Sequence, residues 1–248
     1  MTAPTASILI VDDDVDICAN MADILTDVGY RVDVAHDGVT ALEMVRRGPY
    51  DIALLDLKMP GMDGLTLFRE IKKARAGTVV VIVTAHSRSQ MAEAALAAGA
   101  WDLLAKPVEF SRLLELIAEA LDQPLVLLVD GDRDLCVSLS DLLREHGYRV
   151  SIAHDEKEAT EELRETTGVV LIDMALPDGD GEAVFRTVRE ANPLARTVLI
   201  TGFRGETERL VEQLHAEGAD AVCHKPFDVP QLLDLVNRLA QERWQSRP

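Results

Sequence analysis

The chain repeats itself once. The segment ILIVDDD, from Ile8 to Asp14, returns as LLVDGD from Leu127 to Asp132. Further matches follow in the same order along the chain: LTDVGYRVDVAHD with LREHGYRVSIAHD, LLDLKMPGMDG with LIDMALPDGDG, VIVTAH with VLITGF, and GAWDLLAKP with GADAVCHKP. Because every landmark recurs in order, the 248 residues predict two copies of one domain, residues 1–122 and 123–248.

Within each copy, short apolar runs alternate with stretches of helical periodicity, which is typical of successive βα units. In the first copy strands are expected near these segments: Ser7–Asp12, Arg31–Ala35, Asp51–Leu55, Thr78–Val83 and Trp101–Ala105. The chain is 48% hydrophobic but only 4% aromatic, as aliphatic strands covered by helices on both faces require. We therefore expect an α/β fold with a doubly wound, five-stranded parallel sheet in each copy.

Carboxylates gather where two of these strands end. Asp12, Asp13 and Asp14 follow the first strand, and Asp56 follows the third. At about 5 Å and an effective dielectric of about 20, each pair of like charges costs about 3 kcal/mol. Such a cluster favours protonation or a hard divalent cation, of which Mg²⁺ is the expected one. The alternative is a solvated acidic loop whose aspartates cap helices.

A hydroxyl and an ammonium group follow at the ends of the fourth and fifth strands. Thr84 and Lys106 supply a hydrogen-bond donor and a positive charge, which an anion with several oxygens needs beside a metal. The second copy places Thr201 after Asp173 at the same separation that joins Asp56 to Thr84. The set therefore predicts a site for an anion such as an aspartyl phosphate.

With these motifs, the sequence resembles the receiver (CheY-like) domains of two-component response regulators, twice and over nearly its whole length. The resemblance implies flavodoxin-like (βα)5 domains with strand order 2-1-3-4-5. It also implies a response regulator of a phosphorelay, which accepts a phosphoryl group from a histidine kinase or phosphotransfer protein. Such a protein is a phosphoacceptor that assists its own phosphorylation and dephosphorylation, and is not otherwise an enzyme.

The resemblance also assigns roles to individual residues. Asp56 becomes the phosphoacceptor and, with Asp12 and Asp13, holds Mg²⁺, Asp13 directly and Asp12 largely through water. Thr84 is expected to bind a phosphoryl oxygen, and Lys106 to pair with the phosphate. Cis peptide bonds are expected between each lysine and the following proline, at Lys106-Pro107 and Lys225-Pro226.

The chain departs from the family at a switch position. The family usually has an aromatic residue three positions before the lysine, where this chain has Leu103 and Val222. Trp101 lies two positions before Leu103, and a regular strand would place both side chains on one face. We expect Trp101 to be a packing residue, which leaves aromatic switching in doubt.

The second copy lacks one carboxylate. Asp130 matches Asp12, but Gly131 stands where the metal-binding carboxylate should be, and Asp132 follows it. The remaining counterparts are present: Asp173, Thr201 and Lys225. We favour a degenerate receiver that is poorly phosphorylated or purely structural, and leave open a slow but active one in which Asp132 partly replaces the missing ligand.

Other classes fit less well. Phosphatases of the haloacid dehalogenase class carry D-x-D-x-[T/V] after the first strand, but the last position here is Asp16 or Asp134. Flavodoxins need a Ser/Thr/Gly phosphate loop where this chain has carboxylates, which would repel the phosphate of FMN. The remaining rival is a receiver-like scaffold or adaptor that works without phosphate.

The histidines and cysteines form no catalytic or metal-binding motif. The histidines are interpreted as structural or surface residues: His36, His86, His146, His154, His215 and His224. The cysteines form no CxxC pair and are expected in the cores: Cys18, Cys136 and Cys223. An odd number of separate thiols suits a reducing compartment, so a cytoplasmic location is expected.

The charge favours a protein partner. A formal net charge of −18 repels phosphate backbones and anionic lipid, so we expect neither nucleic acid nor membrane as a partner. No apolar stretch approaches the length of a membrane span. We expect output through contact with a downstream protein, without a separate output domain, and leave a homodimer open.

Overall fold

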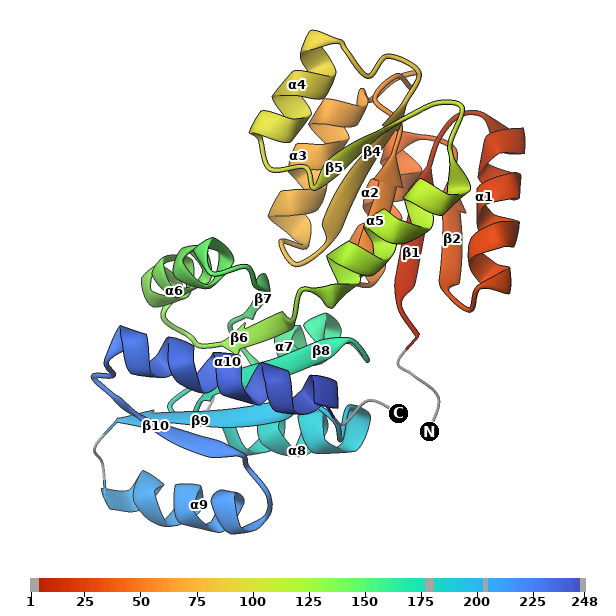
Figure 1. Cartoon of the computed structure of the whole chain (residues 1–248). Coiled ribbons are helices and arrows are strands. Elements are labelled where there is room, and N and C mark those ends of the chain that lie inside the picture. Colours follow the sequence, from red (N-terminus) through yellow and green to blue (C-terminus); the bar gives the residue numbers. More distant parts are fainter. Residues whose placement is uncertain (1–4, 177–180, 203–204, 246–248) are drawn as a thin grey trace. The chain divides into compact units, whose positions relative to one another are not determined.

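A computed structural model describes residues 5–176, 181–202 and 205–245. Contacts within the chain divide it into two compact units between Gln123 and Pro124. The first unit contains β1 (Ser7–Val11), α1 (Val15–Asp27), β2 (Arg31–Ala35), α2 (Gly38–Arg47), β3 (Ile52–Leu55), α3 (Gly64–Ala74), β4 (Val79–Thr84), α4 (Gln90–Ala97), β5 (Asp102–Ala105) and α5 (Phe110–Asp122) (Figure 1). The strands begin and end within about one residue of the predicted bounds.

The second unit repeats this order. It contains β6 (Leu125–Val129), α6 (Arg133–Glu145), β7 (Arg149–Ala153), α7 (Glu156–Glu162), β8 (Thr167–Asp173), α8 (Gly181–Ala191), β9 (Arg196–Gly202), α9 (Gly205–Ala216), β10 (Ala221–Lys225) and α10 (Val229–Gln245). None of the helices in the described parts of the chain is long and apolar enough to cross a membrane.

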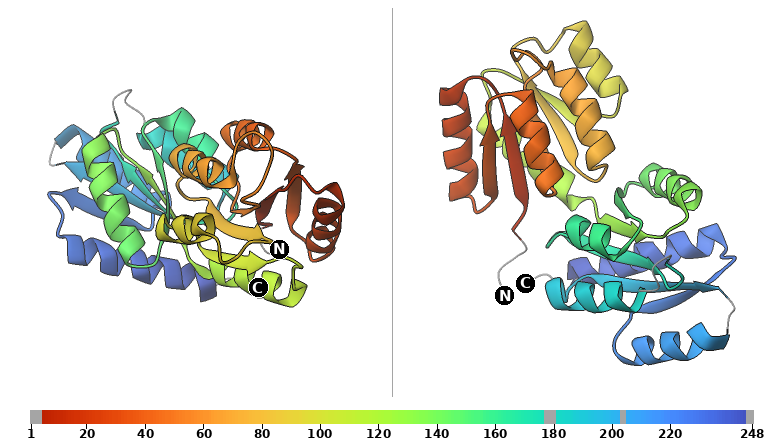
Figure 2. Two further views of the ribbon diagram at one scale, coloured as in Figure 1. Left: turned by 90° about the horizontal axis from the view of Figure 1, so that it is seen from above. Right: turned by 180° about the vertical axis from the view of Figure 1, so that it is seen from behind.

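Each unit is built on a parallel five-stranded sheet. The strand orders are β2-β1-β3-β4-β5 and β7-β6-β8-β9-β10, so the predicted order 2-1-3-4-5 is confirmed in both copies. The central strands β3 and β4 are buried throughout, because helices cover both faces of the sheet (Figures 1 and 2). This is why their sequences are continuous apolar runs and do not alternate.

The two faces of each sheet carry separate cores. In the first unit, α1 and α5 pack on one face, and α2, α3 and α4 on the other. The second unit has the same layers, with α6 and α10 opposite α7, α8 and α9. Cys18 and Cys136 lie in these cores, as predicted, whereas Cys223 is half-buried against one of them.

Trp101 lies on a different face from the one predicted. It precedes the first residue of β5, Asp102, and donates its backbone N–H to Val80 O. Its side chain packs against the core under α1 and α5, whereas Leu103 packs against the opposite core. The prediction of a shared face was wrong because the regular strand starts one residue after Trp101, so strand alternation does not extend to it.

Candidate functional site

The first unit brings its predicted site residues to one edge of the sheet. Asp12 follows β1, Asp56 follows β3, Thr84 ends β4, and Lys106 follows β5. The backbone peptide before Pro107 is cis, as expected, and so is the one before Pro226. In an open parallel sheet the carboxyl ends of the strands meet at a crevice, which is the usual place for a ligand.

Asp12, Asp13 and Asp56 form the acidic group. One carboxylate oxygen from each lies within 4.8 Å of the other two, and no other set of three His, Cys, Asp or Glu side chains in the described ranges meets that distance. Asp12 and Asp56 are only 1% and 7% exposed, whereas Asp13 is exposed. Oxygen donors at this spacing, two of them buried and one open to solvent, fit a hard cation such as Mg²⁺.

Lys106 holds two members of the acidic group. Its Nζ lies 2.6 Å from Asp12 Oδ2 and 2.7 Å from Asp56 Oδ2. Burial lowers the pKa of Lys106, but its contacts with both carboxylates outweigh burial and raise the pKa above its usual value. Burial also raises the pKa of Asp12, which Lys106 only partly opposes. The acidic group has three carboxylates and Lys106 supplies one positive charge, so a further cation would stabilise the site.

The backbone orients the other oxygens. Asp12 Oδ1 accepts the N–H of Asp14, and Asp56 Oδ1 accepts the N–H of Lys58. Asp14, the third acid of the loop, accepts two N–H groups at the start of α1, so it caps that helix and lies outside the acidic group. The predicted metal residues and the helix-cap alternative are thus both present, at different residues of one loop.

Thr84 is fully buried, and its Oγ1 accepts the backbone N–H of His86 at 3.2 Å. This bond occupies a lone pair of the hydroxyl oxygen and leaves the O–H as a donor. His86 itself is exposed. The fourth strand therefore ends with a buried donor beside the lysine-bearing end of β5.

Cys18, expected in the core, and His36, interpreted as a structural or surface residue, also contact the acidic loop Asp12–Asp14. Cys18 Sγ lies 3.4 Å and His36 Nδ1 3.2 Å from the backbone oxygen of Asp12. Burial raises the pKa of the Cys18 thiol to about 11, so it remains an S–H donor at neutral pH. The sequence held a signal for this pair, because both copies carry a cysteine and a histidine at matching positions.

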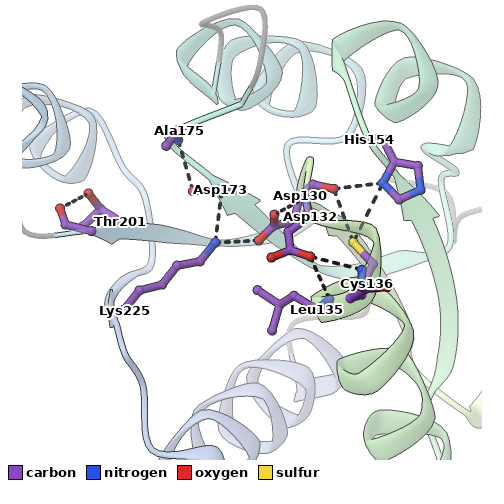
Figure 3. A network of polar contacts seen from close by, with 11 residues as sticks. Asp130, Asp132, Leu135, Cys136, His154, Asp173, Ala175, Thr201 and Lys225 are labelled. Carbon is purple, nitrogen blue, oxygen red and sulfur yellow. Dashed lines mark hydrogen bonds and ion pairs between the residues drawn. The ribbon is translucent and has the colours of Figure 1, made fainter.

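The second unit contains a partial copy of the site (Figure 3). Lys225 Nζ lies 2.7 Å from Asp130 Oδ2 and 3.0 Å from Asp173 Oδ2, as Lys106 bridges the first pair. Asp173 Oδ1 accepts the N–H of Ala175, the counterpart of Lys58. The arrangement of lysine and two aspartates is therefore retained.

The third carboxylate is not retained. Asp132 accepts the N–H groups of Asp134 and Leu135 and caps α6, as Asp14 caps α1. It is thus the structural counterpart of Asp14, and Gly131 occupies the place of Asp13. The Thr201 hydroxyl donates to Gly202 O at 3.1 Å. Its O–H is therefore already engaged, whereas the Thr84 hydroxyl accepts a hydrogen bond and retains its O–H as a donor.

Comparison with known proteins identifies the repeated unit. The sequence profile of the response regulator receiver domain matches residues 8–118 and 126–237. A response regulator receiver protein of Anaeromyxobacter sp. strain Fw109-5 is 35% identical over 240 residues, which cover 96% of this chain and 97% of that protein. The transcriptional regulatory protein ZraR of Klebsiella oxytoca is 40% identical over 121 residues, 49% of this chain but only 27% of that protein.

Solved structures match one copy at a time. A CheY-like receiver domain protein of Methanospirillum hungatei JF-1 shares 36% identity and covers 48% of this chain and 94% of its own, with a TM-score of 0.46. The response regulator TrrA of Thermotoga maritima, solved with Mg²⁺ and BeF, shares 32% identity over 47% of this chain and 99% of its own, with a TM-score of 0.42. By its two profile matches and its full-length relative, the chain belongs to the response regulator receiver family and carries two receiver domains of two-component phosphorelay signalling.

Proposed function

We propose that the first unit accepts a phosphoryl group on Asp56, in a Mg²⁺-dependent reaction with the phosphohistidine of a sensor kinase or phosphotransfer protein. The observation that carries the proposal is the position of Asp56, which belongs to the acidic group and lies 2.7 Å from Lys106 Nζ. A carboxylate between a cation site and an ammonium group is suited to nucleophilic attack on a phosphoryl group.

In the proposed reaction a carboxylate oxygen of Asp56 attacks the phosphorus atom. The new O–P bond forms as the P–N bond to the histidine breaks, and the imidazole keeps the bonding electron pair and takes up a proton from solvent. Negative charge develops on the phosphoryl oxygens, where Lys106 offers its positive charge and Thr84 its O–H. The N–H of Lys58 keeps the Asp56 carboxylate oriented during the attack.

Asp12, Asp13 and Asp56 would hold the metal ion. When bound, Mg²⁺ supplies the positive charge that offsets the phosphoryl oxygens and the surplus of carboxylates. Hydrolysis of the acyl phosphate returns Asp56 to its starting form. We therefore regard the protein as a phosphoacceptor that assists its own turnover, and not as an enzyme that acts on a separate substrate.

Acetyl phosphate provides the test. The full chain is incubated with acetyl phosphate in the presence or absence of Mg²⁺, and the acyl phosphate is trapped and mapped by mass spectrometry. We expect the modification on Asp56 and only in the presence of Mg²⁺. Modification of a different residue of the first unit, or labelling that is unaffected by removal of Mg²⁺, would contradict the proposal.

The two units should differ in metal affinity. Gly131 removes one charged contact, which corresponds to about 1–3 kcal/mol of binding free energy. We expect Mg²⁺ to bind the first unit about 10-fold or more tightly, and the substitution Gly131→Asp to raise the affinity of the second unit by a similar factor. A Mg²⁺ titration of the full chain by NMR measures the affinity of each unit, because the backbone amides at positions 13 and 131 give separate signals in the wild-type chain and in the variant. Equal affinities in the wild-type chain would show that the second site needs no third carboxylate.

A scaffold that works without phosphate is the second candidate function, for the second unit alone. It is favoured because Lys225 already pairs with both remaining carboxylates and Asp132 is engaged as a helix cap. Under labelling conditions that saturate Asp56, this role predicts little or no phosphate on Asp173. Equally fast labelling of the two aspartates would exclude it.

Output is proposed to occur through protein contact. These 248 residues carry a net charge of −18, which opposes approach to a phosphate backbone. We expect no sequence-specific DNA binding by this chain at physiological salt, measured by fluorescence anisotropy over a library of DNA fragments. Nanomolar, sequence-specific binding to one of these fragments would contradict this expectation. A homodimer and a cytoplasmic location remain predictions.

A further inference from the structure

The backbone oxygen of Asp12 receives two side chains from different elements. Cys18, on α1, approaches it with Sγ at 3.4 Å, and His36, directly after β2, with Nδ1 at 3.2 Å. The N–H of Asp12 donates to Ala35 O at 3.2 Å. Both backbone groups of Asp12 are therefore engaged at the point where the chain leaves β1 and turns into the acidic loop.

The chemistry of this contact requires two donors. A carbonyl oxygen only accepts hydrogen bonds, so the thiol must supply its S–H and the imidazole must carry its proton on Nδ1. Two donors on one oxygen restrict rotation of the peptide that joins Asp12 to Asp13. The orientation of this peptide determines the direction in which the Asp13 side chain leaves the backbone.

We propose that Cys18 and His36 are positioning residues for the acidic group: by holding the Asp12 carbonyl they direct the Asp13 carboxylate toward Asp56. The proposal rests on the proposed function, because Asp13 is one of the residues that would hold Mg²⁺. It follows that the pair sets the affinity of the site for Mg²⁺ while touching neither the metal nor the phosphoryl group.

In the second unit a cysteine and a histidine contact the equivalent carbonyl oxygen, but no metal-binding carboxylate follows it. His154 Nδ1 lies 2.9 Å and Cys136 Sγ 3.3 Å from the oxygen of Asp130. Figure 3 shows His154 and Cys136 on one side of Asp130 and Lys225 on the other. The following residue is Gly131, which has no carboxylate to direct, so the second copy serves as an internal control.

Two substitutions of His36 separate positioning from simple packing. His36→Asn places an amide N–H near the former position of Nδ1, whereas His36→Gln places it near that of Nε2. Removal of a group that orients metal ligands typically weakens metal binding by about 10-fold or more. We expect His36→Gln to weaken Mg²⁺ binding at the first unit about 10-fold and His36→Asn to stay near wild type. The amide signal of Asp13 reports this affinity in a Mg²⁺ titration of the full chain by NMR.

Phosphorylation provides a second readout. With acetyl phosphate, His36→Gln should slow labelling of Asp56 when Mg²⁺ is limiting, and the rate should recover at saturating Mg²⁺. Cys18→Ser, which keeps a donor, and Cys18→Ala, which loses it, form an independent pair with the same expected order. His154→Gln is the matched control for His36→Gln. It should change thermal stability by about as much as His36→Gln does, without changing Mg²⁺ binding at the first unit.

A gain-of-function variant of the second unit tests the same contact independently. If Gly131→Asp gives the second unit Mg²⁺ affinity, the double variant Gly131→Asp/His154→Gln should lose about 10-fold of it. Equal Mg²⁺ affinities of His36→Asn and His36→Gln, or of Cys18→Ser and Cys18→Ala, would overturn the positioning role and leave the proposed function intact. No Mg²⁺ response in the wild-type first unit would instead overturn the proposed function.

Discussion

Replacing Asp56 with asparagine is expected to abolish phosphorylation of the first unit. The amide has nearly the same shape as the carboxylate, but it is a poor nucleophile and does not form an acyl phosphate. The fold should survive, because the amide oxygen still accepts the N–H of Lys58, and Lys106 keeps its ion pair with Asp12 at 2.6 Å. Labelling with acetyl phosphate and Mg²⁺, quantified by mass spectrometry, measures the effect.

The second unit offers the matched control for this substitution. Asp173→Asn changes an aspartate with the same contacts, a backbone N–H at 3.0 Å and a lysine Nζ at 3.0 Å. We expect it to leave labelling of Asp56 unchanged. Undiminished phosphate on the first unit of Asp56→Asn would mean that another residue is the acceptor.

Substitution of Gly64 by alanine is expected to damage both stability and phosphorylation. A Cβ atom on Gly64 would lie against the carbonyl oxygen of Asp56 and 2.6 Å from Leu57 Cα. Both contacts involve backbone, which does not move aside as a flexible side chain does. Overpacking of this kind costs about 1–3 kcal/mol of unfolding free energy. It would also displace the strand end that carries Asp56.

The chain has two tryptophans, Trp101 in the first unit and Trp244 in the second. Urea denaturation of the full chain with Trp244 replaced by phenylalanine, followed through Trp101 fluorescence, therefore measures the stability of the first unit. Gly48→Ala is the control, because a Cβ there meets nothing within 4 Å and its φ of −167° is ordinary extended backbone. This control should be neutral or slightly stabilising, by less than about 1 kcal/mol. Equal stabilities of Gly64→Ala and Gly48→Ala would show that the backbone after Asp56 tolerates displacement.

Most of the fold could be predicted because its signals are local. Buried parallel strands are continuous apolar runs, and helices such as α1 and α2 begin after an aspartate that caps them, Asp14 or Asp37. The repeat then strengthened each assignment with a second, diverged copy. The prediction failed at Trp101, where one residue at the start of β5 reversed the face of the side chain.

The site could be predicted only in part. Strand ends located Asp56, Thr84 and Lys106, because parallel strands bring their carboxyl ends to one edge. The role of Asp132 stayed open, because a loop carboxylate is equally able to bind a metal or cap a helix. In the structure it caps α6, where free backbone N–H groups at the helix start need acceptors.

The sequence by itself determined the two-copy architecture, the strand order implied by family resemblance, and the loss of one carboxylate at Gly131. These depend on residue type, periodicity and order, all of which are readable along a chain. Only the tertiary structure decided that Cys18 and His36 meet at the Asp12 carbonyl and that Gly64 packs on the backbone after Asp56. The contacts of Cys18 and Gly64 cross a single loop, and only His36 reaches Asp12 from a distant part of the chain. Their geometry is set by how α1, β2 and α3 pack around β1 and β3, which no local pattern encodes.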